Sequence, residues 1–280
     1  MNYRTVLFAI DDDPQAQAHA DHAAQLACLM EARLVGLGCH RPDVWPGGGV
    51  RTFTDGDPLP IDLRAAEDAA LAREQVFLQR CQFAGLRGSE AVLESSELAA
   101  ALSLHALYAD LVIISQPPVS GACHAERRRR AHAVLHDSVR PVLMLPAVGE
   151  FPPAPESVLL AWDGSASAAR AAAAALPLLQ RAKAVHVVQA VDPNQADIKL
   201  ARKTLEQVCR WLSAHGVHGR ARIAESALPP AEALLTEAAA SNAGLLVMGA
   251  WGHRRIVERL VGGATCTMVD RMTVPCLFMH

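Results

Sequence analysis

The chain has 280 residues, a length that favours two domains of roughly 140 residues each over one large core. Hydrophobic residues make up 51% and charged residues 20%, which is typical of a folded globular protein and excludes a disordered chain. The net charge of −3 provides no basic surface for nucleic acid, and no apolar run approaches the roughly 20 residues that span a membrane.

The first residues, MNYRTVLFAIDDD, contain only a short apolar run that ends in three aspartates, so no signal peptide is predicted. The seven cysteines are odd in number and scattered, without a CxxC pair, as expected of reduced thiols in the cytoplasm. The adjacent pairs Cys39-His40 and Cys123-His124 could be metal ligands. Because a lone Cys-His pair is usually not a ligand set, we predict no metal site there.

The chain repeats itself. Each half begins with an apolar run that ends in aspartate, TVLFAID at 5–11 and SVLLAWD at 157–163, followed by an alanine-rich helical pattern. Two later pairs of segments also match, namely ADLVIIS (109–115) with AGLLVMG (243–249) and RPVLMLP (140–146) with VPCLFMH (274–280). Both later pairs have the same spacing, so the first half carries additional residues upstream of them. These fall in 39–63, whose glycines, prolines and aspartates predict a long loop.

The repeat predicts a first domain at 1–146, a proline-rich linker at 147–156 and a second domain at 157–280. In the second domain we expect strands at 157–162, 185–191, 220–225, 244–249 and 274–279. Helical patterns occur at 165–181, 195–215, 229–242 and 263–272. Short, continuously apolar strands that alternate with helices predict a parallel, doubly wound α/β sheet covered on both faces.

Glycines cluster after the strand expected at 244–249, in the segment LLVMGAWGHRRIVERLVGGAT. Glycine lets the backbone approach a ligand, and successive free N–H groups with a helix N-terminus form an anion site. With Arg254 and Arg255 nearby, the pattern suits a phosphate chain, and Asp163 at the end of the first strand could bind the other end of the ligand. Alternatively, the glycines are ordinary turn residues, the arginines a solvated face, and Asp163 or Ser165 a helix cap.

The spacing G-x2-G-x9-G in this segment resembles the ATP-binding signature of the universal stress protein (UspA) family. The opening VLLAWDGSASAARA and the closing VPCLFMH also resemble that family, so the resemblance covers the whole chain as two tandem domains. It implies a fold with a five-stranded parallel sheet between helices in each domain, Rossmann-like and similar to adenine nucleotide alpha hydrolases. It also implies ATP binding, with Mg²⁺ or Mn²⁺ held by the phosphates.

The resemblance implies roles for individual residues of the second half. Asp163 would lie near adenine, and Ala161 and Val188 would line the base and ribose. The loop that contacts ribose and phosphates would comprise Met248, Gly249, Gly252, Gly262, Gly263 and Ala264. Gly263 stands where the family usually has serine or threonine, so Thr265 is the candidate to supply a hydroxyl. The family also implies pairing of 274–279 with 140–145 within the chain, and leaves a further homodimer open.

The first half departs from this signature. Ser115, Pro118, Arg128 and Arg129 stand where the second half would place its glycines, so the anion nest is missing. We therefore expect a degenerate domain in which Asp11 is a remnant or a cap. The run Arg127–Arg130 is predicted to be a solvated helix face, with an anion or partner contact as the alternative.

No GxSxG, HExxH or P-loop motif is present, and no base for water activation is evident. The prediction is a stress-response protein that binds ATP in its C-terminal domain and acts through nucleotide-dependent interactions, and that is not an enzyme or is at most a slow ATPase. The alternatives are a ligand-free two-domain scaffold and a slow ATP-hydrolysing enzyme.

Overall fold

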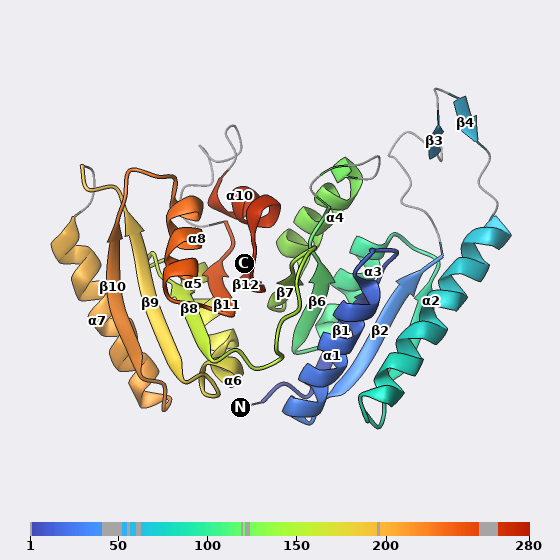
Figure 1. Ribbon diagram of the computed structural model, residues 1–280, viewed down its shortest axis with the longest axis horizontal. Coiled ribbons are helices and arrows are strands. Elements are labelled where there is room, and N and C mark those ends of the chain that lie inside the picture. The colour runs from blue at the N-terminus through green and yellow to red at the C-terminus, as the bar shows by residue number, and fades with distance from the viewer. Residues whose placement is uncertain are drawn as a thin grey trace. The chain divides into compact units, whose positions relative to one another are not determined.

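The computed structural model describes residues 2–40, 52–54, 57–59, 63–118, 120, 124–194, 197–251 and 263–280 (Figure 1). The chain divides into two compact units. The N-terminal unit comprises residues 3–140, and the C-terminal unit comprises residues 141–280 together with the first two residues. Gly252, Gly262, Arg254, Arg255 and Cys123 lie outside the described residues.

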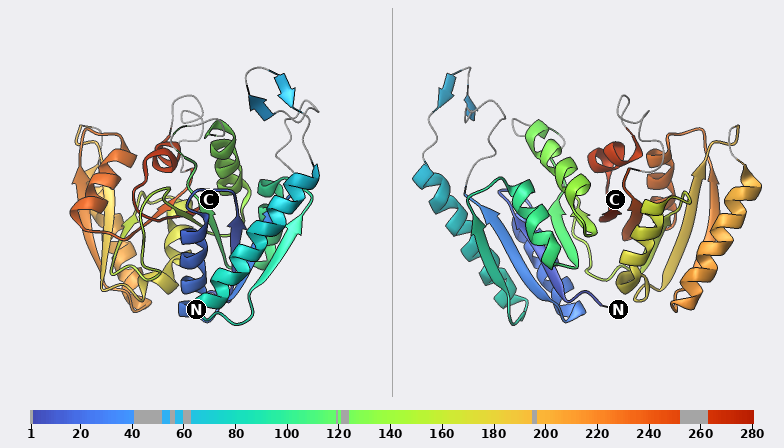
Figure 2. Two further views of the ribbon diagram at one scale, coloured as in Figure 1. Left: turned by 45° about the vertical axis from the view of Figure 1, so that its right-hand side comes forward. Right: turned by 180° about the vertical axis from the view of Figure 1, so that it is seen from behind.

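The N-terminal unit contains a parallel sheet with the strand order β6-β1-β2-β5. Its strands are β1 (Thr5–Ile10), β2 (Arg33–Cys39), β5 (Glu90–Glu94) and β6 (Leu111–Ser115). Its helices are α1 (Ala16–Met30), α2 (Leu63–Phe83), α3 (Leu98–His105), the 3₁₀ turn η1 (Ala106–Tyr108) and α4 (His124–Asp137). Helices α1 and α2 pack together on one face of the sheet, and α3 and α4 on the other (Figures 1 and 2).

The segment 39–63, expected to be one long loop, is partly folded. It contains a short antiparallel pair, β3 (Thr52–Thr54) with β4 (Asp57–Leu59), in which Phe53 lies opposite Pro58. The rest of this insertion lies outside the described residues. Its glycine and proline content gave no alternation long enough to predict the strand pair.

The C-terminal unit contains six strands in the order β10-β9-β8-β11-β12-β7. They are β7 (Val142–Leu145), β8 (Ser157–Ala161), β9 (Ala184–Val191), β10 (Gly219–Glu225), β11 (Leu245–Gly249) and β12 (Cys276–Met279). Neighbours from β10 to β12 are parallel, whereas β7 runs antiparallel to β12, with Leu143 opposite Leu277.

Helices cover both faces of this second sheet (Figure 2). They are α5 (Ala166–Ala174), α6 (Leu176–Leu179), α7 (Ile198–Ala214), α8 (Pro230–Ala240) and α10 (Ala264–Arg271). Helices α8 and α10 contact each other, while α5 packs on β11 and β12 and α7 on β9 and β10. The central strands are buried on both sides, which explains why β8 and β11 are continuously apolar.

The expected fold class is confirmed: the chain is an α/β protein with a Rossmann-like, mostly parallel sheet and helices on both faces. Among the described residues, each sequence half contributes five strands in addition to the β3–β4 pair. One of them differs from the expected grouping, because β7 belongs to the first sequence repeat but packs in the C-terminal unit. Within the described ranges, every helix is too short or too polar to cross a membrane.

Candidate functional site

Each unit has one position where the order of its strands reverses. In the C-terminal unit the chain proceeds from β8 outward through β9 to β10, and then returns to place β11 on the other side of β8. In the N-terminal unit β1, β2 and β5 follow in the same way, and β6 returns beside β1. Loops at the carboxyl ends of such strand pairs diverge and leave a crevice, where ligands of open α/β sheets bind.

The β8–β11 edge brings several of the predicted residues together. Ala161 at the end of β8 lies opposite Val188 of β9, and the next residue, Trp162, donates its backbone N–H to the Val188 carbonyl at 2.8 Å. On the other side of β8, Val247 lies opposite Leu160 and is followed by the predicted Met248 and Gly249. Ala161, Val188 and Met248 are buried, so only a small part of each residue's surface could contact a ligand.

Asp163 follows this edge and is exposed. Its Oδ1 accepts a hydrogen bond from the Ser165 backbone N–H at 2.9 Å, and Ser165 Oγ in turn accepts from the Ala168 N–H at 3.1 Å. Ser165 is therefore the N-cap of α5, and Asp163 fixes the turn that leads into it. The turn leaves the Asp163 carboxylate at the solvent-facing edge of the crevice.

Gly249 has a packing role that the glycine spacing did not reveal. A Cβ at this position would lie 2.5 Å from the Ala168 nitrogen and 2.7 Å from the Ser167 carbonyl carbon. Both are backbone atoms in the first turn of α5, which cannot move as a flexible side chain would. The close approach at Gly249 is thus made by α5, which brings the start of this helix and the Asp163 turn against β11.

The start of α10 forms the other side of the predicted loop. Gly263 is the N-cap of α10 and has no side chain to bond the amides of the first turn. Thr265 is buried, and its Oγ1 accepts the Trp251 backbone N–H at 3.2 Å. This hydroxyl therefore joins the end of β11 to α10. Gly252 and Gly262, the central glycines of the signature, lie outside the described residues.

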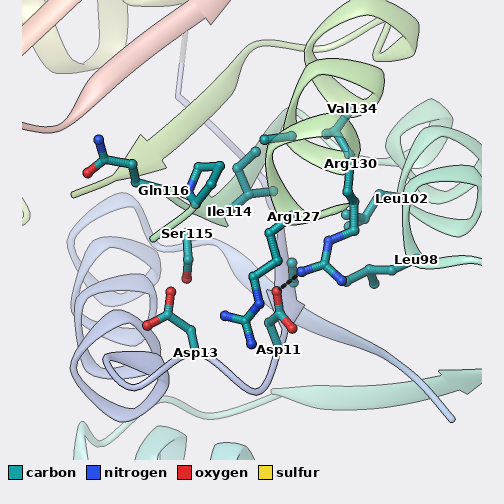
Figure 3. A pocket seen from close by; sticks show the side chains of 13 residues that line it. Asp11, Asp13, Leu98, Leu102, Ile114, Ser115, Gln116, Arg127, Arg130 and Val134 are labelled. Carbon is teal, nitrogen blue, oxygen red and sulfur yellow. Dashed lines mark hydrogen bonds and ion pairs between the residues drawn. The ribbon is translucent and has the colours of Figure 1, made fainter. Parts of the chain in front are cut away.

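The corresponding crevice of the N-terminal unit contains charged side chains (Figure 3). Arg127 and Arg130, on one side of α4, point toward the turn after β1. Arg130 forms an ion pair with Asp11, and Arg127 Nη2 lies 2.5 Å from Asp12 Oδ1. The predicted solvated face is thus wrong for these two arginines, whose side chains are only 13% and 17% exposed, whereas Arg129 is exposed.

Burial controls the charge of Asp11. Desolvation raises the pKa of this carboxyl from 3.8 to about 6, even though Arg130 acts in the opposite direction. The neighbouring Asp12 is also partly desolvated, but its hydrogen bond with Asp11 and the charge of Arg127 outweigh that effect and lower its pKa. The two adjacent carboxyls therefore differ in protonation, and Asp11 is the one that takes up a proton first.

The remainder of this crevice is a small cavity with a volume of about 20 Å³. Leu98, Leu102, Ile114 and Val134 form its apolar wall, and Ser115, Gln116 and Asp13 its polar side (Figure 3). Behind it, His19 Nδ1 lies 2.7 Å from Ser115 Oγ. Sequence reasoning missed this arrangement, although an aspartate run and an arginine run at matching strand ends were a signal for it.

The described part of the chain contains no recognisable metal site or disulfide. No group of three or more histidine, cysteine, aspartate or glutamate side chains there could hold a metal ion. The six described cysteines, Cys39 among them, form no disulfide with one another.

Neither family models nor curated proteins match this chain, so its relationships rest on structure. It is similar to a universal stress protein from Archaeoglobus fulgidus, with a TM-score of 0.72 and 16% identity over 98% of this chain and 95% of the other. A functionally unknown protein from Pseudomonas aeruginosa gives a TM-score of 0.61 at 16% identity, covering 99% and 92% of the two chains. A second protein from that organism, assigned to the universal stress proteins, gives 0.60 at 17%, covering 99% and 93%. Along almost its whole length, the chain has the fold of the universal stress proteins.

Proposed function

We propose that the chain is a tandem universal stress protein that binds ATP in the crevice of its C-terminal unit and acts through interactions that depend on the bound nucleotide. Two observations carry this proposal. The exposed carboxylate of Asp163 follows β8, and the end of the neighbouring strand β11 is joined to the start of α10 by the hydrogen bond from Trp251 to Thr265. The fold similarity to universal stress proteins supports the assignment to the family.

The residues at this edge fit the parts of a nucleotide. The Asp163 carboxylate can accept a hydrogen bond from the adenine amino group or a ribose hydroxyl. The first turn of α10 has a glycine N-cap, so no capping side chain competes with a phosphate for its amides and its positive dipole end. Any Mg²⁺ or Mn²⁺ would be held by the phosphates, since the described residues offer no cluster of protein ligands.

The N-terminal crevice does not fit ATP in the same way. Its arginines occupy the space near the strand ends, and the carboxylate that matches Asp163 is already paired with Arg130. We infer that one ATP binds per chain. A location in the cytoplasm, pairing of the two sequence repeats through 140–145 and 274–279, and a further homodimer are parts of the same proposal.

Introducing a negative charge at Ala264 tests the phosphate site without altering the fold. Ala264 is the first residue of α10 and is half-buried. A glutamate there would be favourable to the helix dipole but would repel the phosphates. In calorimetric titrations with ATP, with and without Mg²⁺, we expect Ala264→Glu to bind at least tenfold more weakly than Ala264→Gln, which has the same size and no charge.

Asp11→Ala is the control for the other unit and should bind ATP as the wild type does. The proposed site is wrong if Ala264→Glu and Ala264→Gln bind ATP equally well. If the wild type does not bind ATP at all, the ligand-free scaffold is the better account. Phosphate release during a long incubation with the wild type would instead favour the slow ATP-hydrolysing enzyme.

A further inference from the structure

The N-terminal crevice concentrates charges that the ATP proposal does not use. Arg127 and Arg130 are three residues apart on α4, so they lie on one side of that helix. Both guanidinium groups are mostly buried and reach the turn that contains Asp11 and Asp12. Such forked donors match the geometry of a carboxylate or a phosphate, whether that group belongs to the protein or to a ligand.

We propose that this crevice is a second ligand site, which binds a small oxyanion by exchange. The ligand takes the place of the Asp11 carboxylate beside Arg130 and Arg127 when Asp11 becomes protonated. This site is independent of nucleotide binding in the C-terminal unit. A phosphate, a sulfate and a small carboxylate share the chemistry that it would recognise.

The charge balance explains why a proton is needed. With Asp11 and Asp12 ionised, each guanidinium group is paired with a carboxylate, so no unpaired positive charge is left for an additional anion. Protonation of Asp11 removes the carboxylate closest to Arg130 and makes room for another negative charge. The Asp12 side chain is 62% exposed, so its ion pair with Arg127 is screened by water and yields easily to a competing anion.

The lining of the cavity favours an oxyanion of small size. The apolar wall from α3, β6 and α4 lowers the local dielectric constant, which strengthens the attraction between a bound anion and the arginines. Ser115 lies beside Arg127 and carries a hydroxyl that can donate a hydrogen bond. The cavity volume of about 20 Å³ excludes an extended polyphosphate.

The pKa of Asp11 and the charged groups around it determine the pH range over which oxyanion binding should change. Arg127 and Arg130 face it from α4, Asp12 and Asp13 lie in its own turn, and α3 contributes only leucines to the cavity. His19 of α1 reaches the site through Ser115. Since the pKa of Asp11 is about 6, the protonated fraction falls from about nine-tenths at pH 5 to about one-thirtieth at pH 7.5. The apparent affinity for an oxyanion should therefore fall roughly thirtyfold over this range.

Sulfate is the suitable probe, because it is a dianion throughout this pH range and any pH dependence comes from the protein. We would titrate the full-length protein with sodium sulfate by calorimetry at pH 5.0 and pH 7.5, with sodium chloride keeping the ionic strength constant. Acetate and inorganic phosphate, titrated in parallel, distinguish carboxylate from phosphate ligands. We expect the wild type to bind sulfate at pH 5.0 and roughly thirtyfold more weakly at pH 7.5.

Asp11→Asn mimics the protonated carboxyl and should bind sulfate equally at both pH values, as the wild type does at pH 5.0. Arg130→Gln should lose binding, whereas Arg129→Gln, on the exposed side of the same helix, should not. If Asp11→Asn binds sulfate no better than the wild type at pH 7.5, the proposal is overturned, whatever Arg130→Gln does. Ala264→Glu should leave this response unchanged, so failure here is distinguishable from failure of the ATP proposal.

Discussion

Asp11 and Asp163 follow the first strand of their respective repeats, but their surroundings give them different properties. Asp163 is exposed and accepts a hydrogen bond from the turn into α5. Asp11 is mostly buried, forms an ion pair with Arg130 and has a raised pKa. The same residue type at matching strand ends is thus an exposed carboxylate in one unit and part of an internal ion pair in the other.

The raised pKa of Asp11 makes folding stability depend on pH. Because the folded state holds this proton more tightly than the unfolded chain, the contribution is fully present below pH 3.8 and is lost as the pH rises through about 6. The change amounts to roughly 3 kcal/mol over this window. Asp12, whose pKa is lowered, contributes in the opposite sense and only at lower pH, where its carboxylate becomes protonated.

We therefore expect Asp11→Asn to remove part of the decline in stability between pH 4 and pH 7. Urea unfolding of wild type and variant at several pH values measures the difference, and the histidines common to both proteins cancel in the comparison. If the unfolding free energy depends on pH in the same way in the two proteins, the pKa of Asp11 is not raised in the folded state.

Gly249 offers a second test at the level of single residues. Gly249→Ala forces a Cβ against two backbone atoms of α5, so we expect a loss of about 1–3 kcal/mol in unfolding free energy, with or without ATP. Gly244→Ala is the matched control, since its nearest contact is a Pro155 side-chain atom at 3.1 Å. If Gly249→Ala weakens only ATP binding and leaves stability unchanged, the glycine serves the ligand rather than the packing of α5.

At the level of elements, the polar residue before a helix determines how well the helix begins. Asp197 accepts the Leu200 N–H at 3.0 Å at the start of α7, whereas Glu97 precedes α3 without a side-chain bond. Asp197→Ala should therefore cost about 1 kcal/mol, and Glu97→Ala less than about 0.5 kcal/mol. Denaturant unfolding of both variants checks this difference, and equal losses would contradict the assigned cap.

The elements of the second repeat could be predicted from sequence because its strands are apolar runs bounded by polar turns. The strand expected at 244–249 is β11, and that at 157–162 is β8. The inward direction of Arg127 and Arg130 could not be predicted, since a run of four arginines contains no periodicity that identifies its buried side. Nor does glycine spacing reveal whether the close neighbour of Gly249 is a ligand or, as the structure shows, helix α5.

At the scale of the whole molecule, the boundary between the compact units differs from the boundary of the sequence repeat. The C-terminal unit includes β7, in which Leu143 and Met144 are buried and lie opposite Leu277 and Cys276. Repeat detection places these residues in the first half, because it follows sequence similarity and not packing. Strand β7 protects the edge of β12, which would otherwise be open to pairing with another chain.

This difference predicts how fragments behave. A fragment of residues 141–280 should fold, whereas residues 147–280, which lack β7, should be much less stable or associate through β12. Each buried side chain lost costs roughly 1.5–3 kcal/mol, and four strand residues together approach the whole stability of a domain. Light scattering and urea unfolding compare the two fragments, and equal, monomeric stability would contradict the assignment of β7 to this unit.

The number of ATP molecules bound per chain tests the central claim most directly, because the two crevices predict different answers. Equilibrium dialysis of the full-length protein against labelled ATP should give one ATP per chain at saturation, and at an ATP concentration near the wild-type Kd, Ala264→Glu should bind much less ATP than the wild type. Two ATP molecules per chain would show that the arginines do not close the N-terminal crevice to nucleotide. No bound ATP would contradict the proposed function altogether.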